Sequence, residues 1–315
     1  MSPAGGPGAP GSRAPGSLYT LSDDLPDLDR PVLLHALPGM VDAGHAVRLA
    51  SEHLMSTLSS KVVATFDHDI LVDYRGGRPS LIFATDHYQD YVPPEITLHA
   101  VEDGVGTPFL MLIGREPDFQ WDRFITSMIE IVERFAVRQS LGLLAIPMAV
   151  PHTRPLSVTG HGTRTGLVPT DGNFLRGNIQ VPATVGSLLE LRLGEAGHDA
   201  AGFAAHVPHY LSATEYPDAA ITLIERVSAV TGLTLPIDGL SEVAVSTRRA
   251  VDLQVAASDE VREIVGTLEK QYDAALATGT GALVSGDQSL PDADQIGAEL
   301  ERYLAGLEEG GPTKG

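Results

Sequence analysis

Short apolar runs alternate with amphipathic stretches along the first three quarters of the chain. Residues 31–37, 109–114 and 141–150 are apolar runs, which are typical of strands buried on both faces of a parallel sheet, and residues 61–66 are expected to form a further strand. Between them, apolar residues recur every three or four positions over 43–58 and 121–135, a spacing that predicts helices packed on a core. This alternation predicts an α/β domain with a mostly parallel sheet.

The pattern continues to about residue 235 and then changes. We expect extended pieces near 70–74, 80–85 and 95–101, and a helix that starts at Pro217 and ends near Gly232. Beyond 235 the spacing is helical throughout, with a linker at 278–291 before a last short helix. We therefore expect a Pro/Gly-rich disordered tail (1–17), an α/β/α domain (18–235) and a small, acidic, all-helical domain (236–315).

Charge and cysteine content exclude several classes of function. The formal net charge of the 315 residues is -20, and such a field repels nucleic acid and anionic membranes. The chain has no cysteine, which excludes disulfides, thiolate metal sites and a cysteine nucleophile. The first residues have no pattern of a signal peptide, and no apolar run approaches the length of a membrane span. We expect a cytoplasmic protein without cofactor or metal.

A glycine-rich turn joins the first buried run to the first helix. Gly39 and Gly44 have the spacing of a phosphate-binding loop, but His45 and Ala46 stand where that loop needs lysine and a hydroxyl. The sequence therefore lacks the pattern of an enzyme that hydrolyses nucleoside triphosphates. Two alternatives remain: the helix N-terminus holds an anion, or the carboxylate of Asp42 caps the same N–H groups.

Two carboxylates, Glu116 and Asp118, follow the run 109–114. Open α/β sheets bind ligands at the carboxyl ends of their strands, so these groups are candidates for a general base or for acceptors of ribose hydroxyls. The alternative is that they are charges favoured by a helix N-terminus.

Basic and imidazole groups gather after the run 141–150. Residues 147–164 hold His152, Arg154, His161 and Arg164 among threonines, a set that suits an anionic or polar ligand. Arginines paired with surrounding acids are the alternative.

Taken together, "LPGMVDAGHAVRLASEHL", "VDYRGGRP", "FLMLIGREPDFQWDRF" and "IPMAVPHTRP" resemble the proteasome assembly chaperone family of the second-subunit type, in its actinobacterial branch. The resemblance spans roughly residues 30–235. It implies a three-layer α/β/α domain similar to nucleoside phosphorylases, with a helical C-terminal part. Relatives that bind proteasomes end in a hydrophobic-Tyr-X tail, whereas this sequence ends "EEGGPTKG".

Two hypotheses of function follow. The first is a binding or assembly protein without catalysis, which forms a homo-oligomer (a dimer or trimer) or holds a protein partner. The second is an enzyme of phosphorylase or hydrolase type that acts on a nucleoside or another anionic or polar small molecule. It would use the turn 39–45 to hold an anion, Glu116 or Asp118 as acceptor or base, and His152 with Arg154 to stabilise charge.

Overall fold

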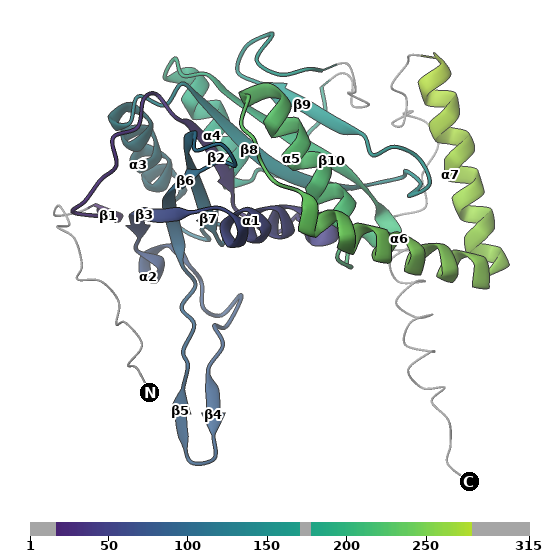
Figure 1. Ribbon diagram of the computed structural model, residues 1–315, viewed down its shortest axis with the longest axis horizontal. Coiled ribbons are helices and arrows are strands. Elements are labelled where there is room, and N and C mark those ends of the chain that lie inside the picture. The colour runs from purple at the N-terminus through teal and green to yellow at the C-terminus, as the bar shows by residue number, and fades with distance from the viewer. Residues whose placement is uncertain (1–16, 171–177, 279–315) are drawn as a thin grey trace.

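An eight-stranded sheet forms the centre of the protein in the computed structural model, which describes residues 17–170 and 178–278 (Figure 1). The strand order is β1-β3-β6-β7-β2-β8-β10-β9. In chain order the strands are β1 (Tyr19–Leu21), β2 (Val32–Ala36), β3 (Ser60–Phe66), β6 (Ile96–Glu102), β7 (Pro108–Gly114), β8 (Gln139–Met148), β9 (Val158–Gly162) and β10 (Ala200–Pro208).

The centre of this sheet is parallel. Strands β7, β2, β8 and β10 pair in parallel, while β6, β3 and β1 on one side and β9 on the other pair antiparallel with their neighbours. Strand β3 also runs in the direction of the central four, so five of the eight strands share one direction. The expectation of a mostly parallel α/β sheet is confirmed.

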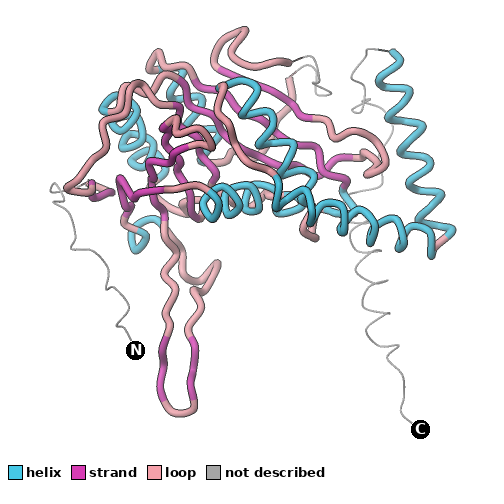
Figure 2. Tube along the Cα trace, in the orientation of Figure 1, coloured by secondary structure: helices cyan, strands magenta, loops and turns pink. Residues whose placement is uncertain are grey.

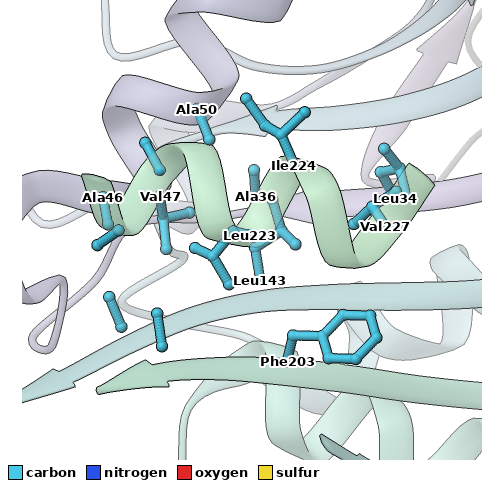
Figure 3. Close-up of a cluster of buried hydrophobic side chains, with 14 of the residues drawn as sticks. Leu34, Ala36, Ala46, Val47, Ala50, Leu143, Phe203, Leu223, Ile224 and Val227 are labelled. Carbon is cyan, nitrogen blue, oxygen red and sulfur yellow. The ribbon is translucent and has the colours of Figure 1, made fainter. Parts of the chain in front are cut away.

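Helices cover both faces and enclose two separate hydrophobic clusters, which makes the domain a three-layer α/β/α sandwich (Figure 2). Helices α1 (Ala46–Thr57) and α5 (Pro217–Thr231) pack on one face. There, Val47, Leu223 and Ile224 meet side chains of β2, β8 and β10 (Figure 3). The opposite face carries α3 (Trp121–Arg134) and α4 (Val185–Glu195).

The predicted ends of α5 are confirmed. Pro217 occupies its first turn, and Gly232 closes it with a φ of 79°, in the left-handed region that glycine adopts without strain. The expected extended piece at 70–74 is wrong at its start, because α2 (His68–Leu71) makes one helical turn there. The N–H groups of Ile70 and Leu71 both donate to the Asp67 carbonyl, and this local bonding overrides the apolar pattern.

Two further helices follow α5. Helix α6 (Asp238–Ala257) buries Leu240, Ala244 and Val251, and two of these, Leu240 and Val251, belong to the cluster under α1 and α5. Helix α7 (Asp259–Thr278) packs Tyr272 and Ala275 against the end of β8 and the loop after it. Within the described residues, no helix combines the length and apolarity that a membrane crossing needs. The expected N-terminal tail up to residue 16, the linker from residue 279 on and the last short helix lie outside the described residues.

A β-hairpin projects from this body. Strands β4 (Ile82–Ala84) and β5 (His87–Gln89) form a two-stranded sheet of their own and extend away from the sandwich (Figures 1 and 2). Phe83 and Tyr88 lie directly opposite each other on it, with ring centroids 5.1 Å apart. We refer to residues 79–92 as the projecting hairpin.

Candidate functional site

The carboxyl ends of the parallel strands lie at one edge of the sheet, and most of the predicted site residues follow them. The turn 37–45 follows β2, the segment 115–120 follows β7, and the loop 149–157 follows β8. Since β7, β2 and β8 are consecutive in the sheet, these three segments are neighbours. Ligands of open α/β sheets bind at such an edge.

The glycine-rich turn is closed by its own carboxylate. Asp42 accepts hydrogen bonds from the N–H groups of Val47 (2.8 Å) and Arg48 (3.1 Å), in the first turn of α1. Burial raises the pKa of this carboxyl above its usual value. Gly44 has a φ of 66° and lies against Tyr216, where a side chain on Gly44 would come within 2.8 Å of its Cβ. The turn thus packs on the segment after β10, and Asp42 occupies the place an anion would take.

A prediction follows for Asp42. Replacing it with alanine should lower the free energy of unfolding by about 1–2 kcal/mol, because two N–H groups at the start of α1 lose their acceptor. The Asp42→Asn variant keeps one carbonyl oxygen as an acceptor. Its free energy of unfolding should fall by less than half of the loss in Asp42→Ala. Urea denaturation measures both values.

Phosphate separates the two alternatives for this turn. If Asp42 fills the position, phosphate should leave the melting temperature of the wild type unchanged and raise that of Asp42→Ala, where the N–H groups are free. A phosphate-dependent rise in the wild type would instead indicate an anion site beside the carboxylate.

Glu116 joins the turn to another helix. Its Oε1 accepts from the N–H of Val185, the first residue of α4, at 2.7 Å. Its carboxylate also lies on Gly39, since a Cβ placed on that glycine would be 1.8 Å from Oε2. The structure therefore brings Gly39 and Glu116 together. Glu116 serves a helix N-terminus, as one alternative anticipated, but the helix is α4, 69 residues further along the chain.

Asp118 serves a different segment. Its Oδ2 accepts from the N–H of Asp73 at 2.7 Å and lies 3.6 Å from the guanidinium of Arg115. Although Asp118 is two residues from Glu116, the two carboxylates hold different parts of the chain.

The loop after β8 is bonded to the last two helices. The buried imidazole of His152 makes hydrogen bonds at Nδ1 with the hydroxyl of Tyr210 (2.7 Å) and at Nε2 with Asp252 of α6 (3.3 Å). Arg154 makes a bidentate ion pair with Asp273 of α7 (2.8 and 2.7 Å) and a further contact with Glu269 (3.2 Å). The hydrogen bonds with Asp273 hold the pKa of Arg154 above its usual value. Both side chains therefore fasten α6 and α7 over this edge of the sheet.

His161 lies elsewhere. It is on β9, opposite Gly202 of β10, six residues before β10 ends, and its Nδ1 is 3.0 Å from the carboxylate of Glu190 on α4. Arg164 pairs with Asp199 at 2.6 Å. The structure thus does not bring His161 and Arg164 together with His152 and Arg154, because β9 leads the chain back along β10.

Sequence reasoning missed a buried histidine on β2. His35 is 3% exposed, and its Nε2 has no hydrogen-bond partner among the described residues. Burial lowers the pKa of His35 to about 4. Its ring lies over Gly142 of β8, where a Cβ would be 2.5 Å from Cε1, just as the ring of His161 lies over Gly202. The signal was a polar residue inside the run "PVLLHAL", together with a glycine in each of two strands.

The described residues contain no group of three or more histidines and carboxylates that could hold a metal ion. The candidate side chains instead bond to backbone groups and to side chains of other elements. The common effect of Asp42, Glu116, His152 and Arg154 is to hold the turn 37–45, the start of helix α4 and helices α6 and α7 near the carboxyl ends of the parallel strands.

Comparison with known proteins gives the following likenesses. The PAC2 family model matches residues 36–255. A Mycobacterium tuberculosis protein of unknown function is 45% identical, with 84% of this chain and 94% of that one covered and a TM-score of 0.80. A Corynebacterium glutamicum protein of unknown function is 37% identical, with 83% and 98% covered and a TM-score of 0.80. A proteasome-assembly chaperone homologue from Mycobacterium tuberculosis is 25% identical, with 74% and 99% covered and a TM-score of 0.68. No curated protein matches.

Proposed function

Because this chain belongs to the PAC2 family, we propose that it is a binding and assembly protein that acts by contacting protein chains and performs no catalysis. The likeness to a proteasome-assembly chaperone homologue supports an assembly role. The hydrogen bonds of Asp42, Glu116, His152 and Arg154 also support it, because each of these groups holds a piece of the fold in place.

The projecting hairpin is the observation that carries this proposal. Two-stranded hairpins are marginally stable in water on their own, and contiguous exposed apolar side chains mark interaction sites. Phe83 is 60% exposed and Tyr88 70% exposed, and further apolar side chains of the hairpin are exposed beside them: Leu81, Ile82, Tyr91 and Val92. A protein surface that covers these side chains would stabilise the hairpin. Most of the binding free energy would come from the two aromatic rings.

We propose that the first such surface is another copy of this chain, so that the protein acts as a homo-oligomer. In that case the double variant Phe83→Ser with Tyr88→Ser should be monomeric at concentrations where the wild type is oligomeric. The fold should persist, because no residue of the hairpin belongs to a hydrophobic cluster of the described core. Size-exclusion chromatography with light scattering measures both masses.

The matched control is Val245→Ser, which removes an equally exposed apolar side chain from α6. It should leave the mass of the oligomer unchanged. A monomeric wild type, or a double variant that keeps the wild-type mass, would contradict self-association through the hairpin.

A further inference from the structure

Helix α6 carries an apolar line of residues that the core does not use. Its packed face holds Leu240, Ala244 and Val251. A second line, spaced at alternating steps of three and four residues, is exposed and consists of Val243, Ser246, Ala250, Leu253 and Ala257. We refer to these five residues as the α6 stripe. Its two largest side chains are 50% exposed (Val243) and 65% exposed (Leu253), so the described part of the chain leaves the stripe largely uncovered.

The α6 stripe has the form of a surface that packs along a second helix. Alternating steps of three and four residues place side chains on one narrow line, as in the seam of a coiled coil. Two of its residues are alanines, and the hydroxyl of Ser246 donates to the carbonyl of Val243 at 2.8 Å. Small side chains without an unpaired donor let the axis of another helix come close. The stripe therefore suits the apolar face of an amphipathic helix.

The last part of this chain has the matching spacing. Within residues 291–307, Ile296, Leu300, Tyr303 and Leu307 recur at steps of four, three and four residues. A helix of that length is marginal in water by itself and depends on an apolar surface against which its apolar face can pack. The segment and the stripe thus supply what the other lacks.

The chain is long enough to bring this segment back to the α6 stripe. Only Ser258 separates α6 from α7, so α7 begins beside the end of the stripe (Figure 1). Helix α7 has 20 residues, which gives it a length of about 30 Å. Residues 279–290 can span up to about 40 Å, more than the length of α7. A segment on such a tether has a local concentration on the order of mM, which favours it over segments of other molecules.

We propose that residues 291–307 form an amphipathic helix that packs on the α6 stripe of the same chain, with Leu300 and Tyr303 against Ala250 and Leu253. The contact lies within one chain and is separate from the self-association proposed for the projecting hairpin. Helix α6 is then covered on two sides, by the core and by this segment. Another protein could bind the stripe only by displacing the segment.

The absence of cysteine from the sequence allows a direct test in the full chain. The thiol of Ala250→Cys lies on the stripe, and its reaction rate with a maleimide is measured with and without the further changes Leu300→Asp and Tyr303→Asp. These changes should raise the rate at least about tenfold, because a covered thiol reacts only while the segment is detached. The thiol of Val245→Cys, at a 61% exposed position off the stripe, should react at the same rate in both backgrounds.

A matched control places the same charge on the other side of the segment. Ala298→Asp with Ala305→Asp should leave the rate of the Ala250→Cys thiol unchanged, because neither position lies on the apolar line of residues 291–307. As a second measurement, Leu300→Asp with Tyr303→Asp should reduce the helical signal in far-ultraviolet circular dichroism, and the control pair should reduce it less.

Three results would overturn the inference. The first is an Ala250→Cys thiol that reacts equally fast with and without Leu300→Asp and Tyr303→Asp, since the stripe is then open or covered by something else, such as a second copy. The second is a faster reaction of the Val245→Cys thiol as well, which indicates a general loosening of α6. The third is an unchanged helical signal. None of these results bears on the hairpin, whose role is tested by the mass of the oligomer.

Discussion

Replacing Gly114 with alanine is expected to lower the free energy of unfolding by about 3–5 kcal/mol, as the sum of backbone strain and overpacking. Gly114 ends β7 with a φ of 126°, a conformation that residues with a Cβ rarely adopt. A Cβ there would be 2.2 Å from the carbonyl oxygen of Glu95 and 2.7 Å from the Cα of Ile96. Both atoms are backbone of the neighbouring segment, so β6 would have to separate from β7 to make room.

The control for this substitution is Gly106→Ala. Gly106 has a comparably positive φ of 86°, but nothing lies within 4 Å of the place where its Cβ would be. The free energy of unfolding of the Gly106→Ala variant should fall only by the contribution of backbone strain, about 1–2 kcal/mol. Urea denaturation gives both values. Equal losses in the two variants would show that contact with β6 adds nothing at Gly114.

Acid is expected to destabilise the protein strongly between pH 7 and pH 5. Burial lowers the pKa values of His35 and His206 to about 4, from the usual 6.5. Between these values the unfolded chain binds protons that the folded chain does not, so stability is present above pH 6.5 and is lost as the pH falls toward 4. The loss at pH 5 is about 2 kcal/mol for each histidine, or about 3–4 kcal/mol for both.

Two carboxyls oppose this trend. Burial raises the pKa values of Asp42 and Asp218, so the folded chain takes up their protons first and gains stability as the pH falls. Burial also lowers the pKa values of His99 and His209, which adds to the loss.

The unfolding free energy of the wild type and of His206→Asn, measured from pH 7 to pH 5, tests the effect. The variant cannot titrate at this position, so its free energy of unfolding should fall less steeply with pH than that of the wild type. The control is His87→Asn, an exposed position on the projecting hairpin, which should keep the wild-type free energy of unfolding at pH 7. If the free energy of unfolding of the wild type does not fall over this range, the lowered pKa values of His35 and His206 are contradicted.

Local signals in the sequence were sufficient for most of the elements, apart from the helical turn α2, and for one capping contact. Pro217 and Gly232 marked the ends of α5, and Asp42 could be placed as the acceptor for the start of α1, because in each case the cause lies within a few residues. The apolar runs located the central strands for the same reason, because burial on both faces of a sheet leaves few polar positions along a strand.

Contacts between distant segments could not be predicted in this way. Glu116 bonds to Val185, and His152 bonds to Asp252 100 residues away, and neither partner is visible without the strand order. The contact of the His35 ring with Gly142 depends on the register between β2 and β8. The sequence of either strand alone does not determine that register. The separation of His161 from His152 depends on the direction of β9.

The projecting hairpin forms its own sheet and contributes no side chain to the hydrophobic clusters of the described core. Selection on folding therefore acts only weakly on its residues. Under the proposed self-association, exchanging Phe83 and Tyr88 for other side chains would change which chains assemble, while the core of the fold stayed the same. Under that proposal, a new partner specificity can evolve in the hairpin at little cost in the stability of the described core.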